Sequence, residues 1–574
     1  MVRLHQPKPE RNSKRTIVFV AFESEFAPVG GLAAVMKALP RHMARLATGE
    51  EVFTITPLFK QITRCHDRRW SSLEDTKRTY RVRFGGDYYS LRIFRHVDEE
   101  GFTTYLLDAD EFFNAPCDCG NPPAPETPCN PYTTPGHPEQ LLQDALFFCA
   151  AIPKALVALG KTENLILSLQ DWQSAPAALT VKTEPSIMSA ACVLTLHNPY
   201  DTSMSNVDVA KIFSRRQLPG STVLTTMLPF VDGPVCTVSE NFAAELTDDP
   251  LHNTVYAPHL QEYFREKGVV GVNNGLFAAP DLSLEALEAA ERGDYAPLLA
   301  EKAERREALI AVLQSYQPQE AWGTLSGLDT FEGPIFMLSG RDDPRQKGYD
   351  LAAAAVRRLK PGRAKFVFSP IPGAEGLEGL RFLKDLAEER RGEVKVFPFR
   401  MEQGYGELQR GSSYMVMCSF YEPFGSATEG YAHGTPIVAR AAGGLVQQVA
   451  PCPGGSLSRA VLDRVVRFHA RQSPPTGFLF REPDLPYETL IEGWRAIVAC
   501  DYEPGERLTQ RTGLQLFDAM VREATWAFED AIDLYNHERH EYAQLILNGF
   551  DMLKVFSWKQ AVREYQRVYD LVSV

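Results

Sequence analysis

The chain has 574 residues, of which 44% are hydrophobic and 23% charged, a balance typical of a globular protein with more than one domain. Its formal net charge of −13 argues against nucleic acid as a general partner, because phosphate backbones bind a basic face. The polar, basic N-terminus lacks the apolar core of a signal peptide, and no run reaches the roughly 18 apolar residues of a membrane helix. We therefore expect a cytoplasmic protein without a membrane partner.

The N-terminal half alternates strand and helix signals after a loose arm at residues 1–15. A Gly30-Gly31 turn follows the first apolar run and opens a helical pattern at 32–44. A longer helix is expected at 141–159, where Pro153 can introduce a kink. Short apolar runs typical of buried strands occur at residues 16–22, 52–56, 165–169, 192–196 and 235–238. This alternation predicts a parallel sheet covered by helices, in a domain of residues 16–275.

The C-terminal half repeats the rhythm after a change of composition. Residues 276–325 are charged and Ala-rich, which predicts a linker region with surface helices at 284–292 and 298–314. Strand candidates then resume at 335–339, 365–369, 394–397, 414–418 and 437–439. We expect a second α/β domain at 326–550 and a terminal helix within 551–574. Parallel sheets bind ligands at the carboxyl ends of their strands, so a cleft between two such domains is the expected place for chemistry.

Ten cysteines are scattered along the chain, and free thiols are the expected state in a cytoplasmic protein. Cys117, Cys119 and Cys129 cluster in a Pro-rich stretch. Three thiols without a fourth Cys or a paired His make a poor zinc site. The cluster is therefore interpreted as a plain loop, and the sequence predicts neither a metal nor a cofactor.

Nine short segments, in this order, resemble those of bacterial glycogen and starch synthases. The first is the glycine-loop segment SEFAPVGGLAAVMKALP at 24–40, and the last is the helix FSWKQAVREYQRVY at 556–569. The others are QDWQSAP (170–176), LTLHN (194–198), CTVSENFAAEL (236–246), GVNNGL (271–276), SGRDDPRQKGYD (339–350), YEPFGSATEGYAHGTPIVARAAGGL (421–445) and TGFLF (476–480). The resemblance extends over residues 16–572. It implies the GT-B fold, with two Rossmann-like domains and a C-terminal helix that crosses back onto the N-terminal domain.

The resemblance also implies retaining transfer of glucose from ADP-glucose or UDP-glucose to the non-reducing end of an α-1,4-glucan. A leaving diphosphate gains negative charge as the glycosidic bond breaks, so such an enzyme needs fixed cations beside it. Arg341 and Lys347 follow a strand of the second domain and are the expected diphosphate partners. The alternative is a solvated loop, because Asp342, Asp343 and Arg345 make the whole segment charged.

Three residues at strand ends of the first domain are further candidates. By resemblance, His197 lies next to the sugar's 6-hydroxyl and the reacting carbon, although a His at a strand end is often only structural. Asp171, followed by Trp172, either orients an acceptor hydroxyl or caps the next helix, and the sequence does not separate these two roles.

Glycines and two glutamates make up the expected donor contacts. Glu422 and Glu429 are seven residues apart, one fewer than is common in retaining transferases of this architecture, and the missing residue falls between Gly425 and Glu429. We expect Glu422 to face the glucose and Glu429 to bind the ribose; otherwise Glu429 simply occupies the first turn of a helix. The other residues expected to contact the donor are Gly30, Gly31, Asn274, Phe424, Gly425, Gly443 and Gly444.

Several positions depart from the family pattern. Pro28-Val29 stand where a Lys is usual before the glycine pair, and Ala34 stands at an acidic position after it. Phe277 replaces an Asp, and glutamines replace two histidines around Asp171-Trp172. The alternatives are therefore a related α-glucosyltransferase with another acceptor or linkage, and a catalytically weak, glucan-binding relative. The sequence does not indicate the nucleotide base or the oligomeric state.

Overall fold

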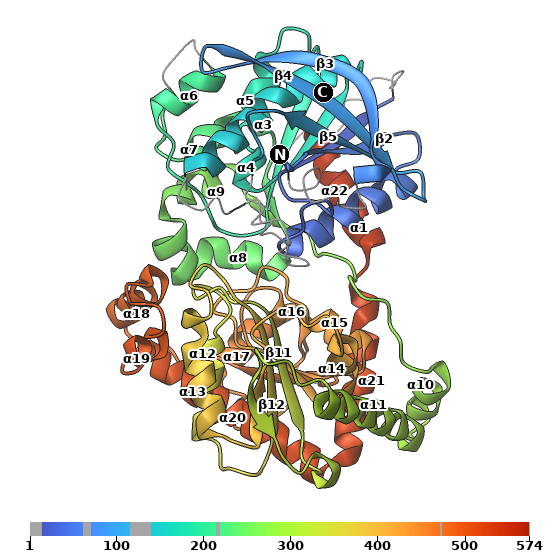
Figure 1. The fold of residues 1–574 in the computed structure, drawn as a ribbon, viewed down its shortest axis with the longest axis vertical. Helices are drawn as coiled ribbons and strands as arrows, with labels where there is room; N and C mark the ends of the chain where they lie inside the picture. Colours follow the sequence, from blue (N-terminus) through green and yellow to red (C-terminus); the bar gives the residue numbers. More distant parts are fainter. Residues whose placement is uncertain are drawn as a thin grey trace, which may run out of the picture. The chain divides into compact units, whose positions relative to one another are not determined.

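A computed structural model describes residues 14–60, 70–114, 132, 139–213, 218–470 and 473–572. The chain forms two compact units, shown in Figure 1. Unit 1 comprises Met1–Val238, Ala257–Val272 and Trp558–Val574, and unit 2 comprises Ser239–Tyr256 and Asn273–Ser557. These limits differ from the expected domains, because Ser239–Tyr256 belongs to unit 2, the next part of unit 1 ends at Val272 rather than 275, and its last part starts at Trp558 rather than 551.

Unit 1 is built on a nine-stranded sheet in the order β3-β4-β5-β2-β1-β6-β7-β8-β9. The strands from β5 to β9 run parallel, with β1 fully buried at the centre. The strands are β1 Thr16–Ala21, β2 Glu51–Pro57, β3 Glu74–Phe84, β4 Asp87–Val97, β5 Thr103–Ala109, β6 Leu165–Gln170, β7 Ala190–Leu196, β8 Val235–Thr237 and β9 Val269–Gly271. The α-helices are α1 Gly31–Leu46, α3 Glu139–Ala158, α4 Asp171–Ser174, α5 Ala177–Thr183, α6 Asn206–Ile212, α7 Val223–Met227, α9 Gln261–Lys267 and α22 Trp558–Val572.

The expected parallel sheet of the first half is in fact mixed. β3 and β4 pair antiparallel across Gly85 and Gly86, whose φ angles of 62° and 105° favour glycine, and β4 also pairs antiparallel with β5. Much of β3 and β4 is exposed, so these strands lack the continuous apolar runs by which the buried strands were predicted.

Contrary to the expectation from sequence, the helix α3 is long and apolar enough to cross a membrane by length and composition, but 67% of that stretch is buried in the structure. It contacts β3, α5 and α6, and it continues through Pro153. Burial on several sides explains its apolar composition, as in the core helix of a globular unit.

Unit 2 is built on a seven-stranded sheet in the order β10-β13-β12-β11-β14-β15-β16, parallel except for the edge strand β10. Its strands are β10 Trp322–Leu325, β11 Ile335–Arg341, β12 Lys365–Ile371, β13 Glu393–Val396, β14 Tyr414–Met417, β15 Ile437–Arg440 and β16 Gly477–Phe480. Its α-helices are α8 Glu240–Asp248, α10 Leu284–Glu291, α11 Ala296–Ser315, α12 Tyr349–Arg358, α13 Arg381–Glu389, α14 Tyr405–Gly411, α15 Ala427–Ala432, α16 Leu445–Gln448, α17 Arg459–Val465, α18 Tyr487–Ala499, α19 Arg507–Arg511, α20 Gln515–His537 and α21 Arg539–Met552.

The last helix, α22, belongs to unit 1 and contacts α1 and β7. Its buried residues recur at helical spacing: Trp558, Ala561, Val562, Tyr565, Val568 and Tyr569. The Tyr569 hydroxyl donates to Ser168 Oγ at 2.9 Å, and the Trp558 ring stacks on His42.

Two expectations concern the less regular parts of the chain. Arg15, placed in the loose arm by the sequence, is instead buried and forms ion pairs with Glu50 and Asp570. The Cys117, Cys119 and Cys129 cluster lies outside the described residues. The cysteines that are described, such as Cys149 and Cys418, carry free thiols.

Candidate active site

In unit 1, Asp171 connects the ends of two neighbouring strands. Its Oδ1 accepts the backbone N–H of His197 at 2.6 Å, and its Oδ2 accepts Asn198 Nδ2 at 3.3 Å. Asp171 opens α4 with a left-handed φ of 58°, a strained conformation for a residue other than glycine. The side chain therefore fixes the His197 turn rather than capping α4, whose first turn has no side-chain cap.

Burial sets the protonation states of this pair. It raises the pKa of Asp171 to about 7, the hydrogen bond from His197 opposes this, and the negative charge of Glu23 adds to it. Burial also lowers the pKa of His197 to about 3, so its imidazole is neutral at physiological pH. His197 Nε2 lies 2.8 Å from Gln170 Oε1, so the glutamine that departs from the family pattern orients the ring.

An internal carboxylate occupies the glycine loop of unit 1. Glu23 Oε1 accepts the backbone N–H groups of Val29, Gly30 and Ala33 at 3.0, 2.6 and 3.2 Å. Glu23 Oε2 accepts the Tyr132 hydroxyl at 2.7 Å. The Gly30 N–H is thus already bonded inside the protein, and donation to a phosphate would require this bond to break. Sequence reasoning missed Glu23, because only the folded turn brings it to the loop.

In unit 2, Lys347 and Glu422 form an ion pair. Lys347 Nζ donates to Glu422 Oε2 at 2.8 Å, and the Ser419 hydroxyl donates to the same oxygen at 2.8 Å. The Glu422 side chain is 8% exposed and that of Lys347 27%. The fold therefore places a cation beside the carboxylate, next to the solvent. The sequence named both charged residues but gave no sign of Ser419.

Arg341 ends β11 in the same loop, with a side chain 40% exposed and 4.0 Å from Asp343. The loop is not the solvated segment that the alternative interpretation described. Asp342 is 2% exposed, and a Cβ added to Gly348 would lie 2.2 Å from the Cys418 carbonyl oxygen. Arg341 and Lys347 thus extend from a packed loop.

The glycines Gly443 and Gly444 allow two turns of unit 2 to approach closely. An added Cβ would lie 1.8 Å from the Glu422 carbonyl oxygen at Gly443, and 2.1 Å from that of Phe424 at Gly444. Gly443 N–H donates to both carboxylate oxygens of Glu245 at 2.9 Å, and Gly444 N–H donates to the Glu422 carbonyl. Burial, with the charge of Asp249, raises the pKa of Glu245 to about 7. This second internal carboxylate was also missed by the sequence.

The remaining donor candidates of unit 2 are mostly buried. Asn274 is 3% exposed, and its Oδ1 has no hydrogen-bond partner among the residues that the structure describes. Such an orphaned oxygen can accept a ligand's hydroxyl. Phe424 packs against Phe277, whose ring replaces the family's carboxylate at that position. Glu429 lies in the first turn of α15. Burial raises the pKa of its carboxyl above the ordinary value; the positive charge of Lys347 opposes this rise, and the negative charge of Glu422 adds to it.

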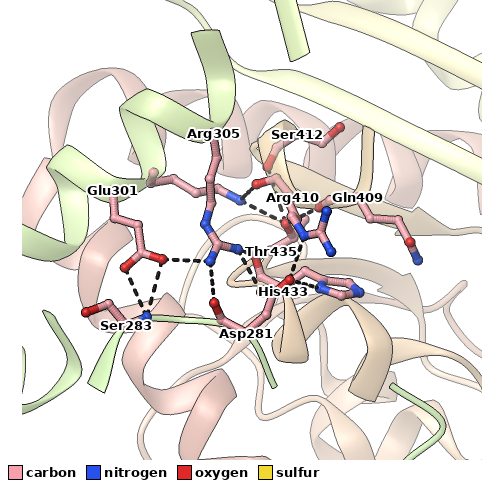
Figure 2. A network of polar contacts seen from close by, with 10 residues as sticks. Asp281, Ser283, Glu301, Arg305, Gln409, Arg410, Ser412, His433 and Thr435 are labelled. Carbon is pink, nitrogen blue, oxygen red and sulfur yellow. Dashed lines mark hydrogen bonds and ion pairs between the residues drawn. The ribbon is translucent and has the colours of Figure 1, made fainter. Parts of the chain in front are cut away.

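A polar network holds His433 and Thr435 of the donor motif (Figure 2). Asp281 accepts hydrogen bonds from Arg305 and Arg410 and contacts His433 Nδ1 at 3.0 Å. Buried Lys302 of α11 donates to Thr435 Oγ1 at 2.9 Å and to the Arg410 carbonyl. The helices expected in the linker region are therefore bonded into unit 2.

The chain is similar in sequence to known protein families. Residues 16–255 match the family described as starch synthase catalytic domain, and residues 308–470 match family 4 glycosyltransferases in conflict systems. Glycogen synthase of Geotalea daltonii is 24% identical, over 97% of this chain and 98% of the relative. That of Koribacter versatilis is 25% identical, over 96% and 97%.

One solved structure has the same fold over nearly the whole chain. It is the catalytic domain of starch synthase IV from Arabidopsis thaliana bound to ADP and acarbose, with a TM-score of 0.68 and 18% identity. The match covers 97% of this chain and 99% of that one. Two α/β units of this topology have the architecture of the GT-B fold. At the level of sequence, the chain is similar to the starch synthase catalytic domain over residues 16–255 and to the two glycogen synthases over nearly its whole length.

Proposed function

We propose that the protein is a retaining glucosyltransferase that moves glucose from ADP-glucose or UDP-glucose to the non-reducing end of an α-1,4-glucan. The observation that carries the proposal is the contact of Lys347 Nζ with Glu422 Oε2 at 2.8 Å, beside the strand end that bears Arg341. A cation suited to a diphosphate thus adjoins a carboxylate suited to a positively charged sugar.

In this proposal, unit 2 binds the nucleotide-sugar donor. Arg341 and Lys347 hold the diphosphate and neutralise the charge that develops on it, so the residues themselves supply the positive charge a metal would otherwise provide. Glu422 stabilises the oxocarbenium-like carbon or its hydroxyls, and Glu429 binds the ribose. Asn274 contributes a buried oxygen, Oδ1, that has no partner among the described residues and would accept a sugar hydroxyl once the donor reaches it.

Unit 1 contributes the neutral His197, held by Asp171 through its backbone and by Gln170 through its ring. An uncharged imidazole whose Nε2–H donates to Gln170 Oε1 can accept a hydrogen bond from a sugar hydroxyl at Nδ1 without repelling a cationic transition state. Retention is explained by attack on the same face from which the diphosphate leaves, with a phosphate oxygen taking the acceptor's proton.

A second candidate, a glucan-binding relative with little turnover, is favoured by one specific observation. Carboxylates of the chain itself, Glu23 and Glu245, occupy N–H groups of both glycine loops. In the proposed function, the N–H groups of these two loops would bind the donor phosphates.

Incubation with radiolabelled ADP-glucose or UDP-glucose, with and without glycogen, tests the proposal. We expect labelled polymer with at least one donor, only when glycogen is present. A labelled small product would indicate a related transferase with another acceptor. Glycogen binding without turnover for either donor would contradict the proposal and support the second candidate.

Arg341→Ala and Lys347→Ala should each lose most of the turnover while the protein stays folded. Removing one charge-stabilising group typically costs about 2–4 kcal/mol of transition-state stabilisation. Initial rates of polymer labelling measure the loss, and circular dichroism checks the fold. Arg345→Ala is the matched control, because Arg345 is an exposed cation of the same loop. Near-normal turnover in both site variants would refute their assigned role.

A further inference from the structure

The short helix α19 contacts both ends of the loop that carries Arg341 and Lys347. Arg507 donates to the two carboxylate oxygens of Asp342, each at 2.8 Å, and to Glu375 Oε2 at 2.8 Å. Asp342 directly follows Arg341. One end of the loop is therefore held by a two-pronged charged contact.

The other end is held by the second arginine of the same helix. Arg511 donates to Asp350 Oδ2, which lies three residues after Lys347, at 2.8 Å. It also donates to the Pro344 carbonyl, in the middle of the loop, at 2.8 Å. The loop is thus fixed to α19 at three points.

Both arginines are buried, which makes a role in simple stabilisation a poor explanation. The side chains of Arg507 and Asp342 are 0% and 1% exposed, and those of Arg511 and Asp350 are 2% and 0% exposed. The cost of removing two charges from water offsets most of their attraction, so apolar residues of similar volume stabilise a fold equally well. A forked guanidinium–carboxylate contact does, however, fix orientation, which apolar packing does much less.

The surroundings leave the loop little freedom to relax around a lost contact. Arg507 packs over the Phe382 ring and Arg511 over that of Phe420, each at 5.3 Å. The Asp342 carbonyl oxygen would lie 2.2 Å from a Cβ added to Gly373. A displacement of Asp342 would therefore also move the adjacent residue Arg341.

We propose that Arg507 and Arg511 of α19 are positioning residues that set where Arg341 and Lys347 meet the donor diphosphate. This inference rests on the proposed function, since it assigns the loop's two cations to the donor. Neither arginine contacts the donor itself; each acts through the acidic residues that flank the loop.

Arg507→Lys tests the inference, because lysine keeps one charge but cannot make the two-pronged contact. We expect the donor KM to rise and kcat/KM to fall by about 10-fold or more, since displaced charge-stabilising groups lose transition-state contact. The KM for glycogen should stay unchanged. Arg357→Lys is the matched control, because Arg357 also binds a carboxylate, that of Glu389, but at the exposed far end of α12. Arg357→Lys should change neither the donor KM nor kcat/KM.

A merely structural role would give a different result: less folded protein and a lower apparent kcat, with the donor KM unchanged, which overturns the inference. Glu375→Gln provides a milder variant should Arg507→Lys fail to fold, since the Glu375 side chain is 18% exposed. It should raise the donor KM in the same direction, and an unchanged value in the folded variant also overturns the inference.

Hydrogen exchange of residues 341–350 provides a readout that does not depend on activity. Exchange should be faster in Arg507→Lys than in the wild type and in Arg357→Lys, and equal rates in all three overturn the inference. If the wild type itself transfers no glucose, the proposed function fails, whereas the exchange result still decides whether α19 holds the loop.

Discussion

Asp171 concentrates the unusual features of unit 1 in one residue. It combines a left-handed backbone, nearly complete burial and a carboxyl whose pKa is raised to about 7. Strain of this kind persists only where surrounding contacts enforce it, and the Asp171 side chain accepts hydrogen bonds from His197 and Asn198. Asp171 therefore combines a strained backbone with a side chain that holds the His197 turn.

Asp171→Asn should change how stability depends on pH. The ordinary value of the carboxyl is 3.8 and its folded pKa is about 7, so between these values the folded protein binds more protons than the unfolded chain. The free energy of unfolding then falls as pH rises through this interval, by at most about 1.4 kcal/mol per pH unit. Asparagine keeps an acceptor for His197 but cannot titrate, so this part of the slope should vanish.

Urea unfolding at pH 5, 6 and 7 measures the effect as the difference between wild type and variant, which cancels other titrating groups. Asp110→Asn, at a side chain 74% exposed, is the matched control for the exchange of a carboxylate for an amide. Parallel stability curves for wild type and Asp171→Asn would contradict the raised pKa.

Some site residues could be predicted from sequence and others could not, for a physical reason. His197 and Asp171 directly follow buried apolar strands, and that position alone marks them as candidates. Glu245 reaches Gly443 across 198 residues of sequence, and Arg507 reaches Asp342 across 165. Both partners lie in helices whose local pattern would be the same without the contact, so only tertiary structure reveals them.

At the scale of elements, the strands that were predicted correctly from sequence are those buried on both faces of the sheet. The apolar run at 165–169 became β6 and that at 437–439 became β15, because parallel strands covered on both faces read as continuous apolar segments. β3 and β4 have mixed, largely exposed patterns that resemble loops. The Gly85-Gly86 turn was the remaining signal for this hairpin.

The donor motif shows how an element absorbs a missing residue. Gly425 adopts a φ of 91°, and α15 begins two residues later at Ala427, so the shortened segment is a turn and not a helix. A deletion in a turn leaves the helical repeat after it intact. Glu429 consequently stays in the first turn of α15.

Glu429→Ala should raise the donor KM by about 10-fold, because losing a hydrogen bond to a charged group costs roughly 1.5–3 kcal/mol. If Glu429 serves only the helix dipole, the donor KM should not change. Glu407→Ala is the matched control, since Glu407 lies in the first turn of α14. A donor-bound structure with Glu429 directed to solvent and the ribose held elsewhere would also contradict the role.

At the scale of the whole molecule, the chain passes from one unit to the other at Val238, Tyr256, Val272 and Ser557. The end of the sequence thus completes the unit that begins it. Residues after Ser557 are assigned to the first domain through the family resemblance, because their position in the sequence places them next to α21 of unit 2. The periodic aromatic residues Trp558, Tyr565 and Tyr569 indicated that this helix needs a partner surface.

Tyr565→Ala should therefore destabilise unit 1 although the substitution is near the C-terminus. Tyr565 is 1% exposed, and truncating a buried aromatic side chain costs about 3–5 kcal/mol. Lys559→Ala, on the exposed face of the same helix, should change stability by no more than about 0.5 kcal/mol. Calorimetry measures the shift of each unfolding transition, and hydrogen exchange assigns it to a unit. In Tyr565→Ala, exchange should accelerate in β1, β6 and β7 while β11 and β12 keep their wild-type rates. Faster exchange confined to the strands of unit 2 would show that α22 stabilises the other unit.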